Sequence, residues 1–167
     1  MSLRFKICVL GEFAVGKTST VARVVRNEFS ETYQTTVGVS IDVKQMQNDA
    51  GDDVKLILWD IAGTDRLASL DKAYLQGMDG YVLVCDGTRP DTLTTAVNLY
   101  REVVSTHGDK PFIALVNKND LVSDWAVSDD QLTGAGSFGI HWTACSAKRG
   151  DHVEQAFRRL ANELTEH

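Results

Sequence analysis

The fold of this 167-residue chain is decided by one stretch, Gly11-Glu12-Phe13-Ala14-Val15-Gly16-Lys17-Thr18. The stretch matches the pattern G-x-x-x-x-G-K-[ST] without a mismatch. An apolar, strand-like segment at 5–10 precedes it, and the segment 18–28 that follows has valines at helical spacing. A strand, a loop and a helix in this order are the context in which the pattern holds phosphate groups. We therefore predict a phosphate-binding loop.

The residue types in this loop suit phosphate chemistry. Glycine at both ends lets the backbone turn so that successive N–H groups face a β-phosphate. The start of the following helix adds partial positive charge. Lys17 can reach the β- and γ-phosphate oxygens, and the Thr18 hydroxyl can bind Mg²⁺. The alternative is a glycine-containing turn with a chance Lys-Thr pair. The predicted phosphate-binding residues are Gly11, Glu12, Phe13, Ala14, Val15, Gly16, Lys17, Thr18 and Ser19.

Strands and helices are predicted to alternate along the chain. The turn at 48–52 joins two strands into an antiparallel hairpin, and the remaining alternation implies a mostly parallel sheet. We predict one α/β domain, residues 1–167, with a six-stranded sheet, one antiparallel edge strand and helices on both faces. The predicted strands are 5–10, 39–47, 54–59, 81–85, 112–116 and 140–143; the predicted helices are 18–28, 73–77, 93–107 and 151–164.

Composition and charge limit the classes of partner. The net charge of −6 and the lack of a basic run argue against nucleic acid and anionic membranes. No signal peptide or membrane-length apolar run is present. We expect a soluble, cytoplasmic monomer, with Asp124, Asp129 and Asp130 on a solvated acidic face. The three cysteines all lie in apolar stretches and are predicted to be core thiols in a reducing compartment: Cys8, Cys85 and Cys145.

A second cluster, Trp59-Asp60-Ile61-Ala62-Gly63, follows the strand 54–59. An acid at the end of a neighbouring strand is what such a loop uses to hold Mg²⁺, here Asp60 through water. Gly63 can offer its N–H to a γ-phosphate because no side chain blocks the approach. Asp and Gly after a strand are also ordinary turn residues, which is the alternative interpretation.

A third cluster, Asn117-Lys118-Asn119-Asp120, follows the strand 112–116. The Asp120 carboxylate can accept hydrogen bonds from the N1–H and the exocyclic amine of guanine. Adenine lacks this pair of donors, so the carboxylate selects guanine. Asn117 can bridge to the phosphate-binding loop, and the Lys118 stem can lie over the base. The alternative is a polar turn.

The segment after the last strand, Ser146-Ala147-Lys148, completes the predicted base site. The Ala147 N–H can bind the guanine O6, and the Ser146 hydroxyl can brace Asp120. By itself this tripeptide is a weak signal.

Taken together, these motifs resemble a Ras-superfamily small GTPase in order and spacing, most closely the Rab-like branch, over essentially the whole chain. The resemblance implies bound GTP or GDP with Mg²⁺. It implies that Thr36, in switch I (29–40), binds Mg²⁺ and the γ-phosphate, that Phe29 lies against guanine, and that Tyr33 covers the phosphates. Switch I and switch II (61–76) together would contact effectors, an exchange factor and an activating protein.

The sequence departs from the family at three places. Thr64 stands where a glutamine usually orients the attacking water, and Phe13 stands where a small residue usually faces the γ-phosphate. The chain ends at His167 with no nearby cysteine, so no prenylation anchor is expected. A sequence with departures of this kind resembles the Rab-like GTPases found in prokaryotes.

The sequence thus predicts a Mg²⁺-dependent guanine-nucleotide switch that hydrolyses GTP slowly. The metal ligands would be Thr18, Thr36 and Asp60, and the catalytic candidates are Lys17, Thr36, Gly63 and Thr64. One alternative is a nucleotide-binding interaction module that does not hydrolyse GTP. Another is a P-loop kinase acting on a small molecule, although the arginine-rich lid of such kinases is missing.

Overall fold

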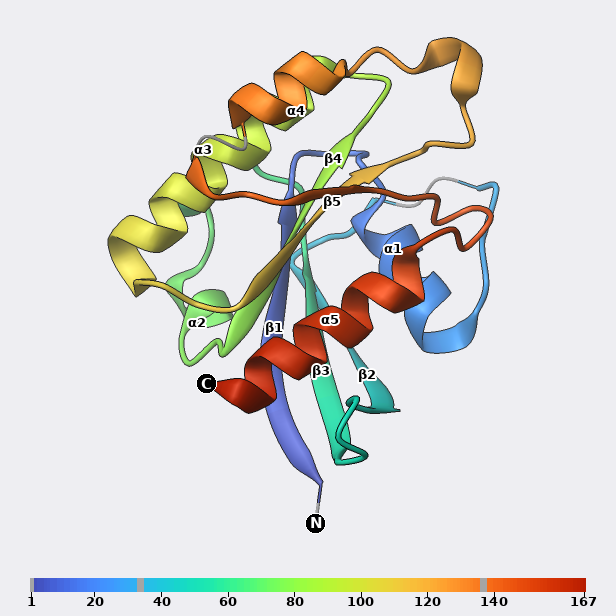
Figure 1. The fold of residues 1–167 in the computed structure, drawn as a ribbon. Helices are drawn as coiled ribbons and strands as arrows, with labels where there is room; N and C mark the ends of the chain where they lie inside the picture. Colours follow the sequence, from blue (N-terminus) through green and yellow to red (C-terminus); the bar gives the residue numbers. More distant parts are fainter. Residues whose placement is uncertain (1, 33–34, 136–137) are drawn as a thin grey trace.

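The computed structural model contains one six-stranded sheet, with strands in the order β2-β3-β1-β4-β5-β6 (Figure 1). It describes residues 2–32, 35–135 and 138–167. Within those ranges every strand pair is parallel except β2 with β3. The predicted α/β fold, with one antiparallel edge strand, is confirmed. The strands are β1 (Leu3–Gly11), β2 (Val39–Gln47), β3 (Asp53–Ile61), β4 (Gly80–Asp86), β5 (Phe112–Asn117) and β6 (Trp142–Ala144).

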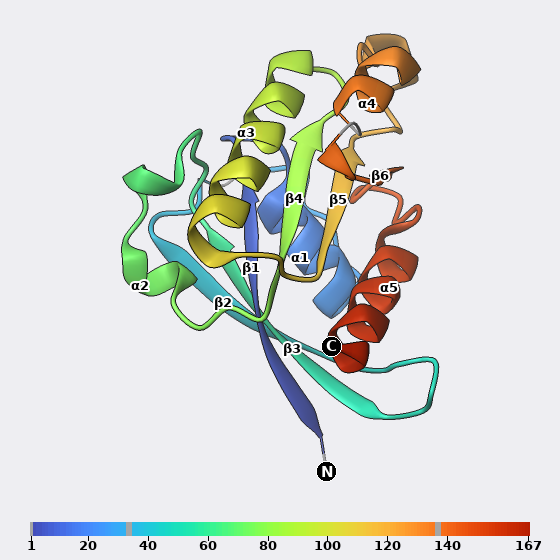
Figure 2. The same ribbon diagram turned by 60° about the vertical axis from the view of Figure 1, so that its left-hand side comes forward.

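Helices cover both faces of the sheet, as predicted (Figure 2). α1 and α5 contact each other on one face, and α3 and α4 contact each other on the opposite face, where α2 also lies. None of the helices in the described ranges is long and apolar enough to cross a bilayer. The helices are α1 (Lys17–Arg26), α2 (Lys72–Leu75), α3 (Pro90–His107), α4 (Asp129–Ala135) and α5 (Val153–Glu166), with 3₁₀ turns at Leu67–Ser69 and Val122–Asp124.

The core has two layers because side chains alternate along each buried strand. In β1, Ile7 and Val9 pack on the face covered by α1 and α5. Cys8 and Leu10, between and beyond them, pack on the face covered by α3. Burial on both faces explains why the predicted parallel strands are nearly continuous apolar runs. The three cysteines are buried and free, which confirms that they are core residues.

Several observed elements differ from the predicted ones by one to three residues at an end, and β3 continues to Ile61, so that Asp60 lies inside the strand and does not follow it. Two further segments differ as follows. The acidic residues Asp129 and Asp130 are exposed as expected, but they form the first turn of α4, where acids stabilise the helix dipole. β6 begins at Trp142 rather than at residue 140, because pairing with β5 starts at Ala114 opposite Trp142. Ile140 instead packs into the core ahead of the strand.

The tip of the β2–β3 hairpin is fixed to the end of α5. The buried Asn48 amide donates to Asp52 Oδ2 (3.0 Å) and to Thr165 Oγ1 (3.1 Å). The Asp49 N–H donates to Asn162 Oδ1 (2.9 Å), and the Asn162 amide donates back to Asp49 Oδ2 (2.7 Å). The contacts with Thr165 and Asn162 join residues more than 100 positions apart and hold the hairpin against the C-terminal helix.

Candidate functional site

The stretch at residues 11–18, predicted to bind phosphate, runs from the last residue of β1 to the start of α1, and its backbone turns through positive φ angles. Ala14 and Gly16 both have positive φ angles, 62° and 101°. A Cβ on Gly16 would lie 2.2 Å from Asn117 Nδ2, so only glycine fits there. α1 begins directly after Gly16 without a side-chain cap, which leaves its first N–H groups to face a ligand.

Lys17 is held at this loop. Its side chain is 6% exposed, and its ammonium donates to the Glu12 carbonyl at 3.0 Å. Burial lowers the pKa of Lys17 from 10.5 to about 8, the Asp60 charge opposes the shift, and the Arg89 charge adds to it. A phosphate anion beside the ammonium would favour its charged form.

The three predicted metal ligands meet at one place. Thr18 Oγ1 lies 2.6 Å from Thr36 Oγ1 and donates to Asp60 Oδ2 at 2.6 Å. Asp60 Oδ1 is buried and has no hydrogen-bond partner among the described residues. Burial raises the pKa of Asp60, while the Thr18 hydrogen bond and the Lys17 charge oppose the rise. A cluster of hydroxyl and carboxylate oxygens with one unsatisfied buried atom fits Mg²⁺.

The segment after β3 packs directly on the loop. A Cβ on Gly63 would lie 2.5 Å from Phe13 Cα, so glycine permits this approach. The Thr64 N–H donates to the Gly11 carbonyl at 3.0 Å. The Thr64 hydroxyl donates to the Arg66 carbonyl (2.8 Å) and accepts from the Arg66 N–H (3.2 Å). The Thr64 side chain is therefore engaged within its own loop.

The three sequence clusters after β1, β5 and β6 are joined by side-chain hydrogen bonds. The Asn117 amide donates to the Val15 carbonyl at 3.1 Å, which is the bridge predicted from the sequence. The Ser146 hydroxyl donates to Asp120 Oδ1 at 2.7 Å, as predicted. The Ala147 N–H donates to Asn117 Oδ1 at 3.0 Å, so its predicted contact with a guanine O6 would require that bond to be shared or moved.

These groups surround a cavity of about 720 Å³, which is within the usual range for a small-molecule site. Tyr33, predicted to cover the phosphates, lies outside the described residues. The cavity is also lined by residues that were not predicted to bind the nucleotide, namely Ala22, Arg26, Glu28, Ser30, Glu31, Thr32 and Leu121. The predicted residues that line it are Phe13, Ala14, Gly16, Lys17, Thr18, Ser19, Phe29, Thr36, Gly63, Asn117, Lys118, Asp120, Ala147 and Lys148.

The remaining predicted residues support the cavity from outside. Val15 is fully buried in the core, and the Glu12 carboxylate accepts a hydrogen bond from Thr95 on α3 (2.8 Å). Gly11 is packed against β4, because a Cβ there would lie 2.4 Å from the Val84 carbonyl oxygen. Asp60, Thr64 and Ser146 act through the contacts given above.

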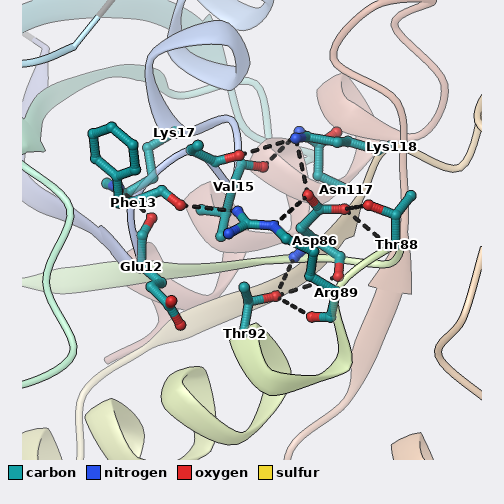
Figure 3. A network of polar contacts seen from close by, with 11 residues as sticks. Glu12, Phe13, Val15, Lys17, Asp86, Thr88, Arg89, Thr92, Asn117 and Lys118 are labelled. Atoms are coloured by element: carbon teal, nitrogen blue, oxygen red, sulfur yellow. Dashed lines mark hydrogen bonds and ion pairs between the residues drawn. The ribbon is translucent and has the colours of Figure 1, made fainter.

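A polar network behind the loop was not predicted from the sequence (Figure 3). Asp86 ends β4 and is 1% exposed. Asp86 Oδ2 accepts from Lys118 Nζ (2.9 Å) and from Arg89 Nε (3.1 Å). Lys118 Nζ also donates to the Ala14 carbonyl (2.9 Å), and Arg89 Nη2 donates to the Phe13 carbonyl (2.9 Å). Like Asp60 and Asn117, Asp86 is a polar residue at the carboxyl end of a buried strand, which is the signal that could have found it.

Arg23 of α1 has a similar role at the segment that follows β6. Its Nε donates to the Ala147 carbonyl at 2.7 Å, and its Nη2 donates to the Lys148 carbonyl. Arg23 thus holds the segment predicted to contact the base.

The chain is similar in sequence to one family of known proteins over nearly its whole length. Residues 6–166 match the Ras family. The chain is 35% identical to Ras-related protein Rab-7L1 from Rattus norvegicus, over 96% of this chain and 81% of that protein. It is 33% identical to Ras-related protein SEC4 from Saccharomyces cerevisiae (96% and 75% covered) and 32% identical to Ras-related protein Rab-32B from Dictyostelium discoideum (97% and 65%).

Proposed function

The chain belongs to the Ras family and its relatives are Rab-like small GTPases, and from this premise we propose that it is a Mg²⁺-dependent guanine-nucleotide switch. The observation that carries the proposal is the joining of the phosphate loop to the Asp120 segment through Asn117. In this arrangement Lys17 and the loop N–H groups bind phosphates, while Asp120 and Ser146 select guanine. Bound Mg²⁺, held by Thr18, Thr36 and, through water, Asp60, would neutralise phosphate charge.

Nucleotide selectivity tests this proposal directly. We expect the purified protein to bind GDP and GTP at least about a thousandfold more tightly than ATP, because a site built for hydrogen-bond donors rejects a base that lacks them. Displacement of a fluorescent GDP analogue by each nucleotide measures the ratio. Equal affinity for ATP and GTP would contradict the proposal.

The switch itself would involve two segments. Loss of a γ-phosphate would remove the contacts proposed for Thr36 and Gly63, so residues 29–40 and 61–76 would rearrange. Apolar side chains near the first segment are exposed, with Val37 89% exposed and Ile41 51% exposed. A hollow of about 1350 Å³ lies between residues 65–77 and α3. These surfaces suit protein effectors, an exchange factor and an activating protein in the cytoplasm.

GTP hydrolysis is proposed to be slow for two reasons. The Thr64 hydroxyl is hydrogen-bonded to the Arg66 backbone, and the threonine side chain is too short to orient a water molecule at a γ-phosphate. We expect Thr64→Gln to accelerate single-turnover GTP hydrolysis by roughly tenfold, because positioning the nucleophile contributes this much or more. Thr64→Ala should change the rate less than about threefold. Both variants keep the backbone bond from residue 64 to Gly11.

The matched control is Asp65→Gln, which places the same amide one residue further on, at an exposed position. It should not accelerate hydrolysis. If Thr64→Ala abolishes hydrolysis at saturating Mg²⁺, then Thr64 is itself catalytic and this account of the site is wrong. The alternative function, a nucleotide-binding module without GTPase activity, is favoured by the same engaged hydroxyl and predicts no turnover in any of the three variants.

A further inference from the structure

Arg89 contacts the phosphate loop from behind, on the side away from the cavity. Its guanidinium donates through Nη2 to the Phe13 carbonyl (2.9 Å) and through Nε to Asp86 Oδ2 (3.1 Å). Figure 3 shows Arg89 lying between the loop and the Asp86 carboxylate. The cavity lining does not include Arg89, so it acts on a ligand only through other groups.

The backbone that carries Arg89 is itself fixed. The Arg89 N–H donates to the Asp86 carbonyl (3.0 Å), and the Arg89 carbonyl accepts from both the Thr92 N–H (3.0 Å) and the Thr92 hydroxyl (2.7 Å). Pro90 follows at the first position of α3, which pre-sets the helix start. The Arg89 side chain therefore starts from a hydrogen-bonded turn. Its Nε is held by the Asp86 carboxylate, which directs the outer nitrogen Nη2 to the Phe13 carbonyl.

Asp86 is stably charged in this network. Burial alone would raise the pKa of Asp86, but hydrogen bonds from Lys118 and from the Thr88 hydroxyl and N–H outweigh it, so the pKa lies below its usual value. Asp86 Oδ1 accepts both Thr88 bonds (2.7 and 2.8 Å), and Oδ2 accepts Lys118 and Arg89. One buried carboxylate thus holds two cations, each of which binds a carbonyl of the phosphate loop.

The two carbonyls belong to consecutive peptide units. In a trans peptide the C=O and N–H point in opposite directions. When Arg89 binds the Phe13 carbonyl from outside, the Ala14 N–H in the same unit points toward the concave side of the loop. A cation on the carbonyl also polarises that N–H, because hydrogen bonds in a chain strengthen one another. Lys118 does the same for the next unit, through the Ala14 carbonyl.

On these grounds we propose that Arg89 is a positioning residue for the β-phosphate. It orients and polarises the Phe13–Ala14 peptide without touching the nucleotide. This inference rests on the proposed function, because it requires a guanosine di- or triphosphate in the cavity. It predicts an effect on phosphates beyond the first, and none on the base.

Comparison of GDP with GMP, which lacks a β-phosphate, tests the assignment. Arg89→Ala should weaken GDP and GTP binding about tenfold, the loss typical of one charge-assisted hydrogen bond, and should weaken GMP binding less than about threefold. Affinities are measured by displacement of a fluorescent GDP analogue at fixed salt and Mg²⁺. Arg89→Lys keeps the positive charge and a hydrogen-bond donor group, so it should recover part of the GDP affinity.

Two other arginines serve as controls. Arg158→Ala removes an exposed arginine paired with Asp49 at the opposite end of the sheet, and should leave all three affinities unchanged. Arg23→Ala loosens the segment at Ala147 and Lys148, and should weaken GMP, GDP and GTP by similar factors. An equal loss for GDP and GMP in Arg89→Ala, or no loss, would overturn the inference alone. Absence of GDP binding by the unaltered protein would overturn the proposed function as well.

Discussion

Asp120→Asn is expected to weaken GTP and GDP binding by at least about a hundredfold and to create a preference for xanthine nucleotides. The carboxylate proposed to accept from guanine N1–H and the exocyclic amine becomes an amide, whose NH₂ would face the exocyclic amine of guanine as a second donor. A buried mismatch of this kind is strongly unfavourable because two donors are left without an acceptor. Xanthine has a 2-oxo group at that place, and it can accept from the new amide.

The measurement is competition between GDP and xanthosine diphosphate for a fluorescent nucleotide. Ser146 donates to Asp120 Oδ1 at 2.7 Å, and asparagine retains that acceptor, so the surrounding loop should be preserved. Asp124→Asn, which makes the same charge change at an exposed residue close in sequence, should leave guanine selectivity unchanged. An unaltered preference for guanine in Asp120→Asn would show that the base lies elsewhere.

Thr18→Asn is expected to lower the affinity for GTP relative to GDP by roughly tenfold to a hundredfold. The Thr18 hydroxyl lies within 2.6 Å of both Thr36 and Asp60, so the substitution disturbs every proposed Mg²⁺ ligand at once. Mg²⁺ bound by these residues would matter most for the triphosphate, because it would neutralise phosphate charge and the triphosphate carries more of it. The ratio is measured by displacement, with and without a chelator of Mg²⁺.

Removal of Mg²⁺ from the unaltered protein should reproduce most of the effect of this substitution. A suitable control is Thr106→Asn, the same change at an exposed position of α3. It should leave the GTP to GDP ratio as it was. If Thr18→Asn leaves that ratio unchanged, Thr18 is not a metal ligand and the proposed Mg²⁺ site must be rebuilt from other residues.

The parts of the fold that could be predicted from sequence are those with a strong local signal. The buried strands β4 and β5 were predicted within one residue at each end, because uninterrupted apolar runs bounded by polar residues have few other interpretations. α4 was missed because it is seven residues long and contains Gly134, and because Leu132 is the one apolar residue among its described side chains that packs against the core. That helix is stabilised by tertiary contact rather than by its own periodicity.

At the site, too, the contacts that could be predicted are those with a strong local signal in the sequence. Asn117 and Ser146 could be assigned contacts because each sits in a recognisable short motif. The position of Asp86 at a strand end could have been noted, but its contact with Lys118, 32 positions away, could not be assigned because no motif joins the two residues. The same holds for Arg89 and Phe13, which are 76 positions apart. The hydrogen bonds of the Thr64 hydroxyl with the Arg66 backbone could not be predicted either, because they depend on the path of residues 61–66 after the sheet. The contacts that were missed are those of residues outside a recognisable motif or within one loop.

The anchoring of the hairpin tip to α5 limits what a change of nucleotide can alter. Sliding β2 by one residue would exchange the faces of Ile41 and Asp42 and break the bonds of Asn48 and Asp49. We therefore expect Ile41 and Val43 to remain exposed in every nucleotide state, while the parts of the segments 29–40 and 61–76 that lie outside β2 and β3 rearrange. For a partner that contacts both regions, the constant surface of β2 would determine which protein binds. The loops that rearrange would determine in which nucleotide state it binds. Changes at Ile41 should then alter which proteins bind, without altering which nucleotide state they prefer.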